Sequence, residues 1–131
     1  MREILFRGKT ILGKWIEGDL LQYLGWGKVH ISQHYRGAGG QEVIPETVGQ
    51  YTGLTDKNGK KIFEGDIIKC ISRFDAKDMV VIFETAEFHL VDCQRYKNYM
   101  ECCGYKQFGT LETEVIGNIH DNPELLRSDT E

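Results

Sequence analysis

The chain has 131 residues, of which 40% are hydrophobic, and it carries a formal net charge of −4 with a pI near 5.6. This length and apolar content suffice for one domain, or for two small subdomains with an ordinary folded core. The acidic balance argues against a protein that coats duplex nucleic acid through its overall charge, because that affinity comes largely from Lys and Arg.

The first ten residues, MREILFRGKT, contain only short apolar runs that are interrupted by charged residues. They resemble neither a signal-peptide core nor a membrane span, which needs roughly 18 consecutive apolar residues. We therefore expect a cytoplasmic protein without a membrane partner. The first fourteen residues are basic and the last eleven are acidic, and we interpret both ends as solvated segments.

The segments between the glycines are short and rich in Ile, Val, Phe and Tyr, a composition typical of a β-rich fold. In chain order, the predicted strands are residues 4–7, 14–24, 28–32, 48–54, 67–72, 79–83, 88–91 and 114–120. A helix is predicted over about 92–104, where Asp92 serves as N-cap and Gly104 follows the last turn. A single helical turn is predicted after Asn122, with Pro123 at its first position.

Two hairpins are expected from local signals. In TDKNGKKIFEGD, the pair Asn58-Gly59 supplies the positive φ angles of a type I′ turn. Residues 84–87 are expected to turn a second hairpin. We place the boundary between two subdomains here, as residues 1–56 and residues 57–131, the latter with a short helical insertion and a C-terminal helical turn.

The tripeptide Glu-Gly-Asp occurs twice, in WIEGDLL (15–21) and in IFEGDII (62–68), and each copy is followed by a Gly-containing segment, TVGQYTG and EVIGNIHD. This pattern indicates two small β units of related design. We expect glycine to relieve a tight turn and Asp to accept neighbouring amides. The residues with an expected turn role are Gly18, Asp19, Gly59, Gly65 and Asp66, and Gly49 and Gly117 are expected to be structural as well. Asp19 and Asp66 are alternatively a catalytic carboxylate pair.

The cysteines are Cys70, Cys93, Cys102 and Cys103, with no C-x-x-C pair among them. In a reducing cytosol they are expected to be thiols. A zinc site can be drawn from His89, Cys93, Cys102 and Cys103, but these spacings match no zinc-finger pattern. We therefore expect neither a metal nor another cofactor.

Three segments carry a family resemblance: MREILFRGK, VIPETVGQYTGLTDKNGKKIFEGDIIKC and EVIGNIHDNPELL. Together they resemble the YopX family of phage and prophage proteins, and they cover roughly half of the chain. The resemblance implies a compact, mostly β fold of small barrel-like units and an accessory role for a phage inside a bacterial host cell. It implies no catalytic motif. The predicted fold is therefore mainly β with minor α, built from two small barrel-like subdomains with an SH3-like C-terminal half.

The leading functional hypothesis is a non-enzymatic interaction or assembly module. Small β-barrels bind through loops and sheet edges, and an exposed edge can pair with a second copy of the chain to give a homo-oligomer. Host or phage proteins are the expected partners. The aromatic residues considered as interface anchors are Trp15, Trp26, Tyr35 and Phe63.

Single-stranded nucleic acid is a more specific partner within this class. The segment RYKNYMECCGYKQF interleaves basic and aromatic residues, a mixture that neutralises phosphates and stacks bases. The candidate residues are Arg95, Tyr96, Lys97, Tyr99 and Lys106. The alternative is an amphipathic helix that buries its tyrosines.

The second functional class is a small metal-dependent hydrolase or nuclease. Its candidate residues are His30 and His34, together with Asp19, Asp66 or His120. The four-residue spacing of His30 and His34 aligns two ligands on a helix, but this segment is predicted to be a strand followed by a Gly-rich loop. We therefore favour two histidines near a surface hairpin.

Overall fold

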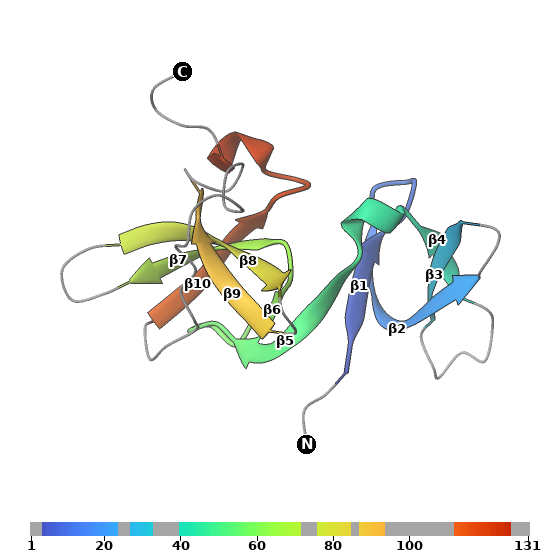
Figure 1. Cartoon of the computed structure of the whole chain (residues 1–131), viewed down its shortest axis with the longest axis horizontal. Helices are drawn as coiled ribbons and strands as arrows, with labels where there is room; N and C mark the ends of the chain where they lie inside the picture. The colour runs from blue at the N-terminus through green and yellow to red at the C-terminus, as the bar shows by residue number, and fades with distance from the viewer. Residues whose placement is uncertain are drawn as a thin grey trace. The chain divides into compact units, whose positions relative to one another are not determined.

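The computed structural model describes residues 4–23, 27–32, 40–71, 76–84, 87–93 and 112–126. The chain divides into two compact units, which we call unit 1 (residues 1–53) and unit 2 (residues 54–131). Figure 1 shows the strands of both units, coloured from blue at the N-terminus to red at the C-terminus.

Unit 1 is an antiparallel arrangement of short strands. Its elements are β1 (Phe6–Lys9), β2 (Trp15–Tyr23), β3 (Lys28–Ser32), β4 (Gln41–Val43), the 3-10 turn η2 (Pro45–Thr47) and β5 (Gly49–Thr55). The strand order is β4-β3-β2-β1-β5, and the last residues of β5 belong to unit 2, where β5 neighbours β6. Hairpin connections of this kind let sequential strands lie side by side.

The core of unit 1 forms around Ile16, Ile31 and Val43, with four partly buried hydrophobic residues packed against them. Gly8 on β1 lies under Val43, because a Cβ atom at position 8 would approach the Val43 side chain to 2.8 Å. A glycine in a strand often marks such a close approach. The absence of a side chain at this position therefore lets β4 pack over β1.

The first Glu-Gly-Asp tripeptide lies inside β2, so the expectation that Gly18 and Asp19 form a turn was wrong. Residues Trp15–Gly18 pair with β1, and residues Asp19–Tyr23 pair with β3. Figure 1 shows β2 curving between these two neighbours. At the change of partner, a Cβ on Gly18 would lie 2.2 Å from the main-chain oxygen of Ser32, so Gly18 allows the neighbouring strand to pass closely at the bend.

Unit 2 contains a four-stranded antiparallel sheet. Its elements are β6 (Lys61–Phe63), β7 (Asp66–Ile71), β8 (Ala76–Glu84), β9 (Glu87–Asp92), β10 (Glu112–Asn118) and the 3-10 turn η4 (Pro123–Leu126). The strand order in the sheet is β10-β7-β8-β9, and β6 neighbours β5. Glu84 pairs with Glu87, which confirms the hairpin expected at residues 84–87.

Hydrophobic residues cover both faces of this sheet. Ile68, Met79 and Leu90 belong to one buried cluster, to which β6 contributes Ile62. The opposite face carries a second cluster, against which Leu125 of η4 packs. Because both faces are buried, β7 reads as a nearly continuous apolar run rather than as an alternating one.

The second Glu-Gly-Asp tripeptide follows β6 in unit 2. Gly65 has φ +91°, a value that side chains rarely tolerate. The Asp66 carboxylate is 1% exposed, and its Oδ2 accepts the main-chain N–H of Phe63 at 2.8 Å. Here Gly65 and Asp66 turn the chain between two strands, as an Asp that accepts a nearby amide commonly does.

The two copies therefore have different structures although the tripeptide is the same. In unit 1, five positions separate Gly13 from Gly18, whereas in unit 2 the extra residue Phe63 lengthens the equivalent interval from Gly59 to Gly65. The first copy continues as a bent strand and the second becomes strand, turn and strand. The neighbours also differ, since β7 pairs directly with β10 but β2 is separated from β5 by β1. The expected similarity of the two halves is thus local.

Gly117, in the second of the two Gly-containing segments, has a specific neighbour. At Gly117 a Cβ would lie 2.4 Å from Oδ1 of Asn122, and this oxygen accepts the Asn118 N–H at 3.2 Å. The Asn118 side chain in turn accepts the N–H groups of His120 and Asp121. The residues after β10 are therefore ordered by Asn-centred turns.

The mainly β prediction is confirmed, and so is the helical turn at Pro123. The expected closure of the two halves into small barrels was wrong, because in the described residues neither sheet closes on itself. The SH3-like character of the C-terminal half stays a prediction. Two strands of three residues, β4 and β6, were not predicted. The helix expected over 92–104 lies almost entirely outside the described residues.

Candidate functional site

The loop between β1 and β2 presents two large aliphatic side chains. The Thr10 N–H donates to the Lys14 carbonyl at 2.9 Å, and the Gly13 N–H donates to the Thr10 carbonyl at 2.9 Å. Gly13 has φ +86°. This is the three-residue hairpin loop that closes through a glycine in the left-handed region. It places Ile11 and Leu12 at the tip of the hairpin.

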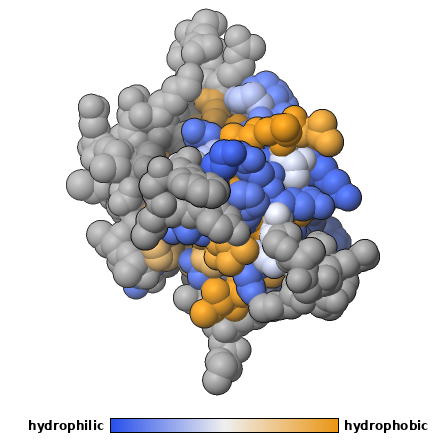
Figure 2. Space-filling view, turned by 90° about the vertical axis from the view of Figure 1, so that its right-hand side faces the viewer, coloured by the Kyte–Doolittle hydropathy of each residue, from blue (hydrophilic) through white to orange (hydrophobic). Residues whose placement is uncertain are grey.

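Ile11 is 81% exposed and Leu12 is 91% exposed. Single exposed aliphatic residues are common on protein surfaces. An adjacent exposed pair at a hairpin tip indicates a binding surface when aromatic or charged side chains lie beside it. On the face drawn in Figure 2, hydrophobic residues reach the surface among hydrophilic ones. The other large hydrophobic residues that the structure shows exposed are Ile4, Leu54 and Phe83.

Behind the tip, the outward face of the hairpin combines an aromatic ring with cations. The register pairs Lys9 with Trp15 and Arg7 with Glu17, so these four side chains share one face. The guanidinium carbon of Arg7 lies 4.8 Å from the centroid of the Trp15 ring, and the ammonium of Lys9 lies 5.9 Å from it. Both distances are those of cation–π contacts.

We call this region the tip surface and define it by Arg7, Lys9, Ile11, Leu12, Lys14 and Trp15. Of these residues, sequence reasoning had singled out only Trp15 as an interface anchor. Ile11 and Leu12 lie outside the predicted strands, and the signal that marks them is an aliphatic pair at loop positions that usually hold polar residues.

The other aromatic anchor candidates divide into two groups. Phe63 is 2% exposed and therefore belongs to the core of unit 2. Trp26 and Tyr35 lie outside the described residues. The nucleic-acid candidates Arg95, Tyr96, Lys97, Tyr99 and Lys106 also lie outside them, so that hypothesis stays a prediction.

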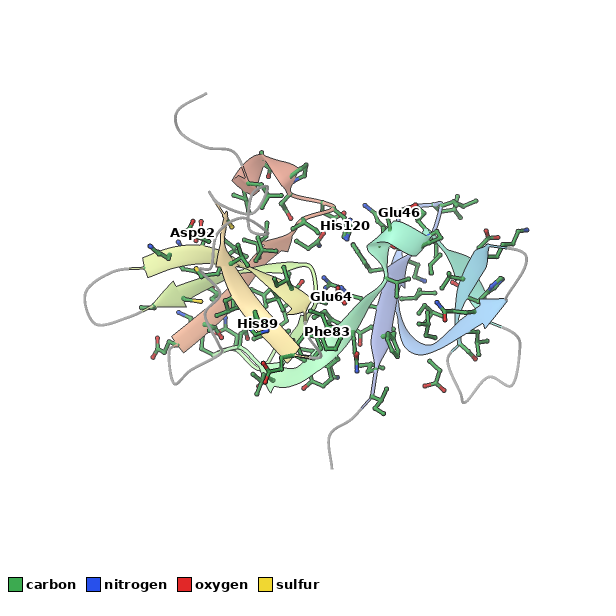
Figure 3. All side chains as sticks on the ribbon, viewed as in Figure 1. Glu46, Glu64, Phe83, His89, Asp92 and His120 are labelled. Atoms are coloured by element: carbon green, nitrogen blue, oxygen red, sulfur yellow. The ribbon has the colours of Figure 1, made fainter. Side chains whose placement is uncertain are left out.

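Two of the hydrolase candidates, Asp19 and His30, are diagonal neighbours on one face of the β2–β3 pair, whereas Asp66 and His120 belong to unit 2. His30 lies on β3 opposite Leu21, and Asp19 lies on β2 opposite Ser32. His120, labelled in Figure 3, follows β10 in unit 2. His34 lies outside the described residues. Within the ranges that the structure describes, no group of three or more His, Cys, Asp or Glu residues could hold a metal ion.

Two residues of the hypothetical zinc set, His89 and Cys93, are described. Figure 3 shows His89 on β9, and both residues are buried. Burial and, after it, the negative charges of Asp78 and Asp92 together raise the pKa of the Cys93 thiol to about 12. A thiol is a metal ligand or a nucleophile mainly as the thiolate, so the surroundings of Cys93 favour a structural role. Cys102 and Cys103 lie outside the described residues.

A structural carboxylate that the sequence did not reveal is Asp56. Its Oδ1 accepts the N–H groups of Asn58 and Lys60 at 2.9 Å each, and its Oδ2 accepts the Val115 N–H at 2.9 Å. Burial raises the pKa of this carboxyl, but the three backbone hydrogen bonds and the nearby Lys60 charge outweigh burial and leave the pKa below its ordinary value of 3.8. Asp56 thus fixes the β5–β6 loop and joins it to β10.

The comparisons with known proteins agree with the fold of both units. A family model described as YopX protein matches residues 5–127. The chain belongs to the YopX family. The family match extends over both units, including the segments that the sequence-based resemblance did not cover. No curated protein matches the chain.

Among solved structures, this YopX chain is similar to the crystal structure of protein EF1440 from Enterococcus faecalis. The sequence identity is 23%, the TM-score is 0.51, and the match covers 97% of this chain and all of the other chain. At this identity the similarity supports the fold alone. No helix in the described ranges is long and apolar enough to cross a membrane.

Proposed function

We propose that this YopX protein is a non-enzymatic interaction module that acts for a phage or prophage inside a bacterial cell, and that its tip surface contacts the partner. The observation that carries the proposal is the exposure of Ile11 and Leu12 on a hydrogen-bonded hairpin loop, directly in front of a tryptophan with two neighbouring cations. Aromatic and arginine anchors supply much of the energy of an interface, exposed aliphatic side chains gain free energy when a partner buries them, and cations add specificity and speed of association.

The hairpin is held in place from its base, which favours binding without reorganisation. The Lys9 N–H donates to Oγ1 of Thr47 at 2.9 Å, and the Ile44 N–H donates to the Lys9 carbonyl at 2.8 Å. The hydroxyl of Thr47 donates to the Ile44 carbonyl at 2.6 Å. These bonds tie the end of β1 to the turn η2, so a partner need not order the hairpin on binding.

The proposal is tested by isolating the tagged full chain from its host and measuring what accompanies it. Light-scattering chromatography, the absorbance ratio and mass spectrometry report copy number, nucleic acid and protein partners. We expect the double variant I11N/L12N to lose the accompanying material. The control variant I4N replaces another exposed aliphatic residue of unit 1, 69% exposed but outside the loop, and should retain it. If wild type and I11N/L12N were isolated with the same partners in the same amounts, the proposal would be contradicted.

A further inference from the structure

The two units contain the same hairpin loop built from different residues. In unit 2, the Asp56 N–H donates to the Lys60 carbonyl at 2.8 Å, and the Gly59 N–H donates to the Asp56 carbonyl at 3.0 Å. Gly59 has φ +83°. The bonding of TILGK (10–14) thus repeats in DKNGK (56–60), where the three-residue loop replaces the two-residue type I′ turn expected at Asn58-Gly59. In both loops the first side chain accepts the N–H of the fifth residue.

The two loops differ in the residues at their two central positions. The two central positions are Lys57 and Asn58 in unit 2, and Ile11 and Leu12 in unit 1. Because the same hydrogen bonds form with polar residues at these positions, the turn geometry does not require aliphatic side chains. Neither Ile11 nor Leu12 is covered by the core of unit 1. The aliphatic pair therefore calls for an explanation outside folding.

The charges around the tip indicate the chemistry of what covers it. Lys9 and Lys14 flank the loop, and Arg7 lies behind them against the Trp15 ring. Unit 1 contains six Lys and Arg residues against five Asp and Glu, whereas unit 2 contains ten against fifteen. Unit 1 as a whole is thus nearly balanced in charge, so the cations beside the tip are a local feature, and the surface complementary to them is anionic.

The order of these residues along the hairpin corresponds to the layers of a lipid interface, from the acyl chains to the headgroups. Trp15 is the first residue of β2 and pairs with Lys9, the last residue of β1, so the ring lies at the base of the loop that carries Leu12 at its tip. Apolar side chains of interfacial segments reach roughly 5–10 Å into the headgroup and acyl boundary. Tryptophan is favoured at the headgroup level, and Lys and Arg direct their charges to the phosphates. A protein pocket would also accept two aliphatic side chains, but the order of aliphatic tip, cations and tryptophan is typical of an interfacial anchor.

We propose that the tip surface binds the face of an anionic lipid bilayer, with Ile11 and Leu12 inserted and Lys9 and Lys14 at the lipid phosphates, while Arg7 packs behind them against the Trp15 ring. The inference rests on the proposed function, because it names the partner of the same surface. It revises the expectation from sequence that the protein has no membrane partner, and it needs no spanning segment. Neither an aliphatic pair nor a few cations alone gives stable attachment, so both signals are required.

Sedimentation of the full chain with vesicles of phosphatidylcholine and phosphatidylglycerol in a 7:3 mixture tests the inference. We expect wild type to bind the mixed vesicles at low salt. The bound fraction should fall at least about tenfold on pure phosphatidylcholine vesicles, and also on the mixed vesicles in about 0.5 M salt. The variant I11N/L12N, which leaves the net charge unchanged, should bind at least about tenfold more weakly. The control I4N should bind as wild type does. In a W26F background, the emission of Trp15 should shift to shorter wavelength on the mixed vesicles.

Two results would overturn the inference: no binding of wild type to the mixed vesicles at low salt, or equal binding of wild type and I11N/L12N. The isolation experiment then separates this failure from failure of the proposed function. If I11N/L12N still loses its partner in the host, the tip surface binds a protein pocket and the proposed function stands. If that variant retains every partner, both proposals fail.

Discussion

Oδ2 of Asp56 accepts the main-chain N–H of Val115 at 2.9 Å, so a loop residue of one hairpin holds a strand that begins more than fifty positions later. A second bond, from the Lys57 N–H to the Thr113 carbonyl at 2.9 Å, lies beside it. These two bonds use the Val115 N–H and the Thr113 carbonyl of β10, which point away from the neighbouring strand β7. Through these bonds the Asp56 side chain stabilises the pairing of the β5–β6 loop with β10 in unit 2.

The variant D56N should destabilise the protein by about 1–3 kcal/mol, because it replaces a charged acceptor by an amide whose NH₂ group faces an N–H donor. Urea unfolding followed by far-UV circular dichroism measures this loss. The control K57A removes only the ion pair between Lys57 and Glu114, whose charged atoms are 3.8 Å apart on partly exposed side chains, and should cost less than about 1 kcal/mol. If D56N and K57A lost the same free energy of unfolding, the hydrogen bonds of Asp56 would contribute no more to stability than the exposed ion pair does.

The pH dependence of Asp56 follows from its lowered pKa. A carboxyl with a lower pKa in the folded state stabilises the protein fully above its ordinary value of 3.8, and this contribution is lost as the pH falls through the folded value. The difference in unfolding free energy between wild type and D56N should therefore be constant at neutral pH and shrink below about pH 4. A difference that stays constant in acid would contradict the assignment.

The limits of sequence reasoning are visible in these same elements. The longer strands were predicted because alternation and glycine punctuation are local, whereas β4 and β6 have three residues each and are defined by pairing with distant strands. The Asp56 bond to Val115 was hidden for the same reason. Identical Glu-Gly-Asp tripeptides differ in structure because neighbouring backbone, not the tripeptide, determines the role of each glycine. The tip surface was missed because exposure of Ile11 and Leu12 depends on the hairpin register.

The variant G18A should destabilise unit 1 by about 2–4 kcal/mol, since its methyl group would lie 2.2 Å from the Ser32 carbonyl and the backbone would have to move. The comparison is G59A, where nothing lies within 4 Å and only the positive φ is strained, at a cost of about 1–2 kcal/mol. Both tryptophans lie in unit 1, so tryptophan fluorescence follows the unfolding of unit 1 in G18A, and urea unfolding followed by far-UV circular dichroism compares the two variants. A smaller effect for G18A than for G59A would refute the close approach of β3.

The two aspartates of the repeated tripeptide should respond differently to the same substitution. D66N alters a buried carboxylate that accepts the Phe63 amide, and should cost about 2–4 kcal/mol. D19N changes a half-buried strand residue and should cost less than about 1 kcal/mol. Thermal unfolding of both variants checks this order. Equal effects would indicate that the two copies have the same structural role.

Cys93 should be chemically inert in the folded protein. Its burial, followed by the charges of Asp78 and Asp92, raises the thiol pKa to about 12, so the reactive thiolate is scarce at pH 8. In the variant C102S/C103S, which leaves Cys70 and Cys93, both buried, a thiol reagent should react more than about tenfold more slowly than after urea denaturation. The stabilisation that comes from keeping Cys93 protonated is present below its ordinary pKa of 9.0 and is lost as the pH rises from there towards 12. Rapid modification of the folded variant at pH 8 would show that β9 opens readily and that the buried cluster around Cys93 does not protect it.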